Sequence, residues 1–262
     1  MWEVNKEWSE PFLLACKDSA SNDIAFKNFR RDERFYSILE HVTYDEGVLY
    51  IKERLDTNIC SQSFKDLLSK MLENDRIGNP VRHDYPDIGL VCPTTLRYIK
   101  NLYDIASMID ASEPKFNNIV EIGGGYGGLC RMLKSIFSIN NYLLIDFSEV
   151  NQLSKRYLSE YYNDKILWMT PETFSNVHNV DLCISNYAFS ECDRTIQNEY
   201  YERVIKKSKM FYITYNNISD RNMSFNEFHI LASQTFDIKV QKEERESHTN
   251  YVMFGNNREY FN

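Results

Sequence analysis

Residues 119–128 read IVEIGGGYGG, and the rest of the chain is best interpreted outward from this stretch. Residues 118–122 predict a short buried strand, after which five glycines follow within six residues. Glycine adopts positive φ angles and lets a ligand approach the backbone closely, and the helix expected next begins with free N–H groups. Because so many glycines are costly to order, the loop is expected to bind a ligand rather than to form a plain turn.

Strand-like and helix-like segments alternate around this loop. Further strands are predicted at 142–145, 165–169, 180–185, 210–215, 236–240 and 251–254, and helices at 94–109, 129–137, 148–161, 193–206 and 224–232. Ser148 is expected to cap one of these helices, and Ser224 with Glu227 has the spacing of a capping box. The alternation predicts an α/β fold, with a parallel sheet covered by helices on both faces. The last two of its seven strands have no helix between them and should pair antiparallel at one edge.

The region before the sheet has weaker signals. Residues 23–41 and 61–73 show helical spacing of apolar positions, and the glycine and prolines of residues 78–93 indicate a loop-rich junction. We therefore expect residues 1–90 to form a helical N-terminal cap and residues 91–262 to form the ligand-binding domain. The cap is expected to contact a substrate or a second subunit.

Composition excludes several classes of function. The net charge is −8, and both parts of the chain are acidic, which disfavours nucleic acid or an anionic membrane surface as a partner. The six cysteines are scattered without a C-x-x-C pair, which argues against a zinc site and a disulfide framework. No apolar run reaches the length of a membrane span, and the N-terminus is charged where a signal peptide would be apolar. A cytoplasmic location is expected.

Two classes of cofactor could occupy the glycine loop. Its residues satisfy G-x-G-x-x-G, the dinucleotide fingerprint that receives a pyrophosphate. Glu121, however, precedes the first glycine by two positions, where its carboxylate would repel a pyrophosphate and could orient the ammonium group of a methionine moiety. Asp146 ends the next predicted strand and can accept both ribose hydroxyls in either class, unless it only begins a helix. Phe147 could cover an adenine face.

At this point the chain resembles a known group. The spacing E-x-G-x-G-x-G is the first motif of the class I methyltransferases that use S-adenosylmethionine. More narrowly, the chain resembles the sugar O-methyltransferase family encoded with bacterial surface-polysaccharide genes, over roughly residues 75–255. The matching stretches are 77–80, 95–98, 120–128, 144–146 and 184–191, together with the single positions Val150, Leu153, Tyr157 and Leu158. The chain departs from the family at Phe147-Ser148, where a Leu-Pro pair is expected.

The resemblance implies a Rossmann-like sheet, S-adenosylmethionine as methyl donor, S-adenosylhomocysteine as product, and a sugar hydroxyl as acceptor. The residues expected to bind the cofactor are Glu121, Gly123, Gly125, Tyr126, Gly127, Asp146, Phe147, Asn186 and Tyr187. The acceptor could be a nucleotide sugar, a lipid-linked glycan or a finished polymer, and a homo-oligomer is left open.

Methyl transfer to a hydroxyl needs alignment and a base. Glu191 follows the fourth predicted strand and is the expected general base, with Asn186 and Tyr187 shaping the methyl pocket; alternatively, Glu191 only begins a helix and pairs with Arg194. His83 and His248 are alternative bases, because histidine titrates near neutral pH.

The sequence also leaves open a metal site and two other functions. Glu191, Asp193 and Asn216 or Asn217 could bind Mg²⁺ through oxygen atoms, but their spacing is not diagnostic and no metal is predicted. The other functions are an NAD-dependent sugar oxidoreductase or epimerase, and a non-catalytic subunit that binds the cofactor. Tyr161 and Lys165 match the Tyr-x-x-x-Lys pair of short-chain oxidoreductases, but they precede the third strand, where that pair is not expected.

Overall fold

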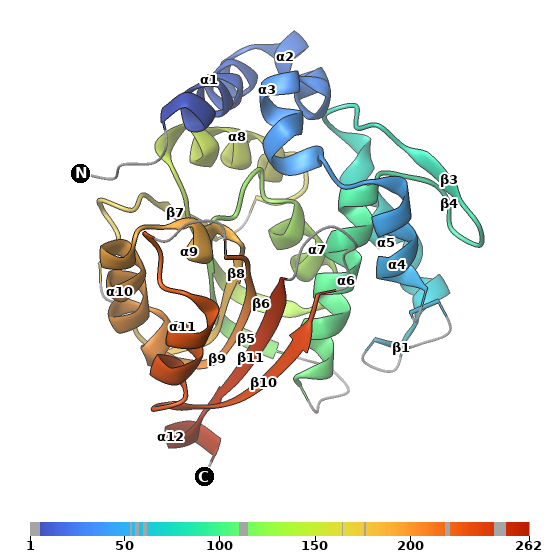
Figure 1. The fold of residues 1–262 in the computed structure, drawn as a ribbon. Helices are drawn as coiled ribbons and strands as arrows, with labels where there is room; N and C mark the ends of the chain where they lie inside the picture. The colour runs from blue at the N-terminus through green and yellow to red at the C-terminus, as the bar shows by residue number, and fades with distance from the viewer. Residues whose placement is uncertain are drawn as a thin grey trace.

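The computed structural model describes residues 6–52, 54–55, 58–59, 62–109, 115–163, 165–175, 177–217, 221–243 and 250–261. Among these residues, a seven-stranded sheet runs through the centre of the molecule (Figure 1). Its strands are β5 (Lys115–Ile122), β6 (Ser138–Ile145), β7 (Ile166–Met169), β8 (Val180–Asn186), β9 (Ser208–Tyr215), β10 (Phe236–Lys242) and β11 (Tyr251–Asn257).

The strand order is β10-β11-β9-β8-β5-β6-β7. The strands from β5 to β9 are parallel, and β11 lies antiparallel between β9 and β10. The order reverses between β8 and β5, as in a doubly wound Rossmann-like sheet, so the predicted fold class is confirmed. The antiparallel pairing of the last two strands is confirmed as well.

Helices cover both faces of the sheet. α6 (Pro93–Ser107), α7 (Gly128–Ile136) and α8 (Ser148–Ser159) pack on one face, where their apolar residues share a core with Ile119 and Leu144. α10 (Arg194–Arg203) and α11 (Phe225–Ala232) pack on the other face, with Val120 and Leu143. Neighbouring strand residues point to opposite faces, so a sheet buried on both sides needs the continuous apolar runs seen in the sequence.

The N-terminal part of the chain packs against the first of these faces. α1 (Lys6–Ser21) lies along α8, α4 (Tyr44–Ile51) along α6, and α5 (Phe64–Leu72) against α7 (Figure 1). Two short hairpins complete this part, β1 (Asn58–Ile59) with β2 (Gln62–Ser63) and β3 (His83–Tyr85) with β4 (Gly89–Val91). A single cluster of buried apolar residues runs from Ala15 through Met71 to the sheet, so one continuous core crosses residue 90.

The single helix predicted over residues 23–41 is wrong. The chain forms α2 (Asp23–Asn28), the 3-10 turn η1 (Phe29–Arg31), α3 (Glu33–Phe35) and the π-helical turn η2 (Tyr36–Glu40). The break falls at Asp32, which has extended φ/ψ angles and accepts a hydrogen bond from the backbone N–H of Arg34. A short acidic side chain is more stable as such a cap than inside a helix.

Two other local predictions can be compared with the structure. Ser148 is not a cap: α8 begins at Ser148, Phe147 occupies the capping position, and no side chain caps that end. The capping box of Ser224 and Glu227 is confirmed at the start of α11. The remaining short elements are η3 (Glu73–Arg76), α9 (Ala188–Glu191), η4 (Ile205–Lys207) and α12 (Arg258–Phe261). No helix in the described part of the chain is long and apolar enough to cross a membrane.

Candidate active site

The glycine loop joins β5 to α7 and is folded tightly against the neighbouring strand ends. The N–H of Gly123 donates a hydrogen bond to the carbonyl oxygen of Ile145 at the end of β6, with an N···O distance of 2.8 Å. Gly123 has a φ angle of 76°, and a Cβ atom built there would overlap the Cβ of Ala188 in α9. Only glycine satisfies both conditions, because L side chains rarely adopt this φ and no space remains for one.

Asp146 links the end of β6 to this loop. Its carboxylate accepts hydrogen bonds from the N–H of Gly125 (2.9 Å) and from the N–H of Phe147 (2.8 Å). Burial raises the pKa of Asp146 to about 6, although the two backbone hydrogen bonds lower it. An ionised carboxylate can accept about four hydrogen bonds. Asp146 therefore retains acceptor positions for the hydroxyls of a ligand.

Glu121 lies under the loop, near the end of β5. Its side chain is only 2% exposed and accepts a hydrogen bond of 2.7 Å from the hydroxyl of Tyr142. Burial raises its pKa to about 8, which the hydrogen bond from Tyr142 lowers and the charge of Asp146 raises further. A carboxyl group in this state becomes an anion when a cation approaches, since an opposite charge favours the ionised form.

A cavity of about 160 Å³ lies beyond the carboxyl ends of β5 and β6. Its lining brings together four predicted site residues, namely Gly123, Asp146, Phe147 and Glu191. The other lining residues are Ile122, Ile145, Pro171, Ala188, Cys192, Asp193, Ile196 and Tyr200. This position agrees with the rule that ligands of open α/β sheets bind outside the carboxyl ends of the strands. That rule could have drawn attention to Pro171, which follows β7.

Glu191 reaches the cavity from the end of α9. It accepts a hydrogen bond of 2.9 Å from the side-chain amide of Asn216. The suggested partner Arg194 instead forms its ion pair with Glu227, at 2.8 Å. Within the described ranges, no three His, Cys, Asp or Glu side chains are grouped closely enough to hold a metal ion.

Asn186 is the last residue of β8 and Tyr187 follows it, and neither of them lines the cavity. The side-chain oxygen of Asn186 accepts from Asn101 of α6 (3.1 Å) and from Thr214 of β9 (3.0 Å). Tyr187 has a φ angle of 68° and donates its hydroxyl proton to Glu243. A positive φ at a bulky residue is strained, and such residues cluster at functional sites.

Tyr126 faces the core rather than the cavity. It is fully buried, and its ring packs edge-on against Phe29 (5.4 Å between centroids) and Tyr157 (4.9 Å). The Arg30 guanidinium lies 5.1 Å from the ring centroid. Tyr126 can therefore contribute to a cofactor site only through its backbone.

Of the two histidines proposed as alternative bases, His83 does not line the cavity. His83 is exposed on β3, where its ring meets Tyr44 at 5.8 Å. His248 lies outside the described residues.

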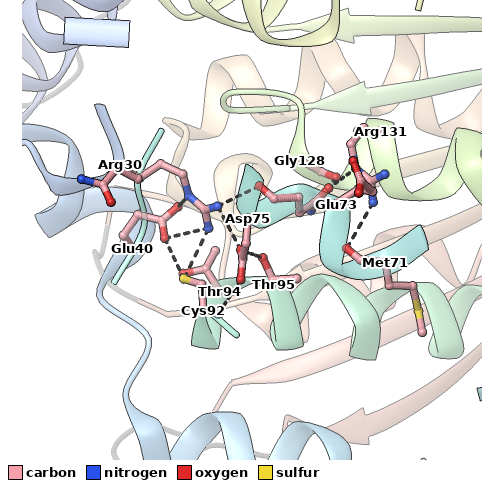
Figure 2. Close-up of polar contacts among 12 residues, drawn as sticks. Arg30, Glu40, Met71, Glu73, Asp75, Cys92, Thr94, Thr95, Gly128 and Arg131 are labelled. Atoms are coloured by element: carbon pink, nitrogen blue, oxygen red, sulfur yellow. Dashed lines mark hydrogen bonds and ion pairs between the residues drawn. The ribbon is translucent and has the colours of Figure 1, made fainter. Parts of the chain in front are cut away.

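A buried polar network attaches the N-terminal part to α6 and α7 (Figure 2). Arg30 donates to Glu40 (2.7 Å and 3.0 Å) and to Asp75 (3.2 Å). Asp75 also accepts from the hydroxyl of Thr95 at 2.6 Å, at the start of α6. Asn74, the neighbour of Asp75, donates to the carbonyl of Gly128 at 3.1 Å. The end of the glycine loop is therefore held in place by hydrogen bonds from residues that precede the sheet in the sequence.

No protein-family model matches this sequence, and no curated protein matches it either. Similar folds are found among solved structures. TrmK of M. capricolum, solved with S-adenosylhomocysteine, is 14% identical with a TM-score of 0.45, covering 60% of this chain and 68% of that one. The PH0226 protein of Pyrococcus horikoshii OT3 is 12% identical with a TM-score of 0.49, covering 62% and 90%.

A third similar structure is the magnesium protoporphyrin IX methyltransferase of Synechocystis PCC 6803, solved with bound S-adenosylmethionine. It is 9% identical with a TM-score of 0.45, covering 55% of this chain and 71% of that one. Because these TM-scores are below 0.5, we infer function from the residues of this chain alone.

Proposed function

We propose that this chain is a methyltransferase that uses S-adenosylmethionine and methylates a hydroxyl group of a sugar. The observation that carries the proposal is the contact between Asp146 and the glycine loop. The carboxylate that follows β6 is bonded to the N–H of Gly125, and Asp146 and Gly123 both line the cavity. The sugar acceptor follows from the family resemblance and is the finer part of the proposal.

The residues around the cavity fit an adenosine. Asp146 offers acceptor positions to two ribose hydroxyls, and Phe147 offers an aromatic face to the base. Glu121 fits the amino-acid end, because its buried carboxyl would ionise beside an ammonium group. No basic side chain among the described residues lines the cavity, which suits a ligand without phosphates better than a dinucleotide.

S-adenosylmethionine, when bound, supplies a methyl group on a positively charged sulfur. The residues of this chain then have to orient the two reactants and exclude water, and alignment is the larger part of that contribution. Glu191 was expected to be the general base. Glu191 lines the same cavity as Asp146, and this position supports a contact between Glu191 and the nucleoside more than it supports a role as general base.

The acceptor would lie on the side of Asn186. The side-chain oxygen of Asn186 is bonded to Asn101 and Thr214, whereas its amide N–H groups have no acceptor within the described part of the chain. Uncharged amide and hydroxyl groups of this kind suit a ligand rich in hydroxyls. The overall negative charge of the chain agrees with an acceptor other than nucleic acid.

The experiment that tests the proposal is calorimetric titration with S-adenosylhomocysteine and, separately, with NAD⁺. We expect S-adenosylhomocysteine to bind and Asp146→Asn to weaken it roughly 10- to 100-fold, the value of one or two hydrogen bonds to a charged group. Asp237→Asn, an exposed aspartate on β10, is the matched control and should leave binding unchanged. Binding of NAD⁺ alone would contradict the proposal. Transfer of labelled methyl to a panel of nucleotide sugars and glycans tests the acceptor.

A further inference from the structure

Arg97 is a buried arginine of α6 that lacks the partners other buried cations have. It is 6% exposed and donates one hydrogen bond, to the carbonyl of Leu39 at 3.2 Å. Its guanidinium lies 5.7 Å from the ring centroid of Tyr187. No carboxylate of a described residue lies within ion-pair distance of it. The carboxylate of Glu243 acts on Arg97 only from beyond ion-pair distance, and it is itself bonded to Tyr187. A buried charge without a counter-charge in direct contact is costly, so Arg97 is poised for an anion.

Comparison with other buried basic side chains makes the difference clear. Arg30 is bound by the carboxylates of Glu40 and Asp75, and Lys100 lies 2.6 Å from Asp104. Arg131 has three oxygen acceptors, from Asn74, Lys70 and Met71. A guanidinium carries five N–H donors in a fixed geometry. Arg97 uses one of them within the described part of the chain.

Arg97 also lies where an elongated ligand would end. Its partner Leu39 packs on the glycine loop, since a Cβ atom built at Gly125 would lie 3.2 Å from the Cδ1 of Leu39. Its other neighbour, Tyr187, follows β8. Arg97 therefore stands between the loop after β5 and the end of β8. The strand order reverses between these two strands, and ligands bind at such a switch point.

We propose that Arg97 binds the carboxylate of the methionine part of S-adenosylmethionine. The inference rests on the proposed function and names a residue that holds the other end of the same ligand. Asp146, at the end of β6, holds the ribose, and the amino-acid end extends past Gly125 toward β8. A guanidinium binds a carboxylate through two parallel hydrogen bonds, which fixes the orientation of the ligand as well as its position.

The test compares two ligands that differ by one group. S-adenosylhomocysteine carries the carboxylate, whereas S-adenosyl-3-thiopropylamine keeps the amine and lacks only the carboxylate. The native protein should prefer S-adenosylhomocysteine, and Arg97→Gln should reduce this preference roughly 10- to 100-fold, the value of a charged hydrogen bond. Arg97→Lys, which keeps the charge and loses the two-pronged geometry, should retain part of it. Calorimetry measures both dissociation constants for each variant.

Arg76→Gln is the matched control, because Arg76 also lies over a tyrosine ring, that of Tyr161, at 4.8 Å. It should leave the ratio of the two dissociation constants unchanged. If Arg97→Gln leaves that ratio unchanged, or weakens both ligands equally, the inference is overturned while the cofactor assignment stands. If the native protein binds neither ligand, the proposed function itself fails.

Discussion

Two buried carboxyl groups beside the glycine loop give the protein an unusual dependence on pH. Burial raises the pKa of Glu121 to about 8 and that of Asp146 to about 6, so both hold a proton more tightly when folded than when unfolded. The stability that each contributes is therefore fully present below the unfolded pKa and is lost as the pH rises through the folded pKa. This is the reverse of a carboxylate stabilised by a salt bridge.

Glu121→Gln tests whether stability falls as the pH rises, at the residue whose pKa shift is the larger of the two. Between about pH 5.5 and 7, Glu121 should lower the unfolding free energy of the native protein by about 1.4 kcal/mol per pH unit, because only the unfolded chain releases its proton there. Glutamine does not titrate, so the variant should lack this slope. Urea unfolding of both proteins across this range measures it. Parallel stability curves would contradict the pKa of about 8.

At the scale of elements, the sheet could be predicted from the sequence because its strands are buried on both faces. Residues 180–185 are apolar except for Asp181 and Ser185 and form most of β8, whereas the more polar start of β6, at 138–141, lies outside the predicted strand. The short turns of residues 23–40 could not be predicted, because Arg30 is also held by Asp75, which lies 45 residues further along the chain. Local periodicity carries no information about such contacts.

In the candidate site, too, some residues could be predicted from the sequence and others depend on contacts between distant parts of the chain. Gly123 and Asp146 were found from spacing, since the ends of neighbouring parallel strands meet at one edge. The orientation of Tyr126 into the core and the isolation of Arg97 depend on side chains from the N-terminal part, so no local pattern indicates them.

The turn between β5 and α7 gives a prediction at this scale. Gly123→Ala should destabilise the fold by more than the about 1–3 kcal/mol of a strained backbone, because the new methyl group also meets Ala188. It should also abolish binding of S-adenosylhomocysteine. Gly89→Ala is the matched control: Gly89 has a φ angle of 89° with open space around it, and its substitution should cost strain alone. Equal losses of stability in the two variants would contradict the close contact with Ala188.

For the whole molecule, the N-terminal part and the sheet share one apolar core and one buried polar network. Arg30→Met should lower the unfolding free energy by about 3–5 kcal/mol, because Glu40 and Asp75 are left buried without their counter-charge. Arg34→Met, which removes partly exposed pairs with Asp18 and Asp32, should cost about 1 kcal/mol or less.

The same variant distinguishes one folding unit from two. Circular dichroism and tryptophan fluorescence should report a single unfolding transition in Arg30→Met, shifted as a whole to lower denaturant concentration. A variant in which the N-terminal part melts first, with the sheet unchanged, would contradict a shared core.

The burial of Tyr126 has a consequence for protein engineering. Its ring belongs to the loop at the heart of the candidate site, yet its neighbours Phe29 and Arg30 come from the opening segment of the chain. Replacing the N-terminal segment by that of another protein would remove the side chains against which the ring of Tyr126 packs. New acceptor preferences would therefore have to be sought by point substitutions around Asn186, and not by exchanging modules.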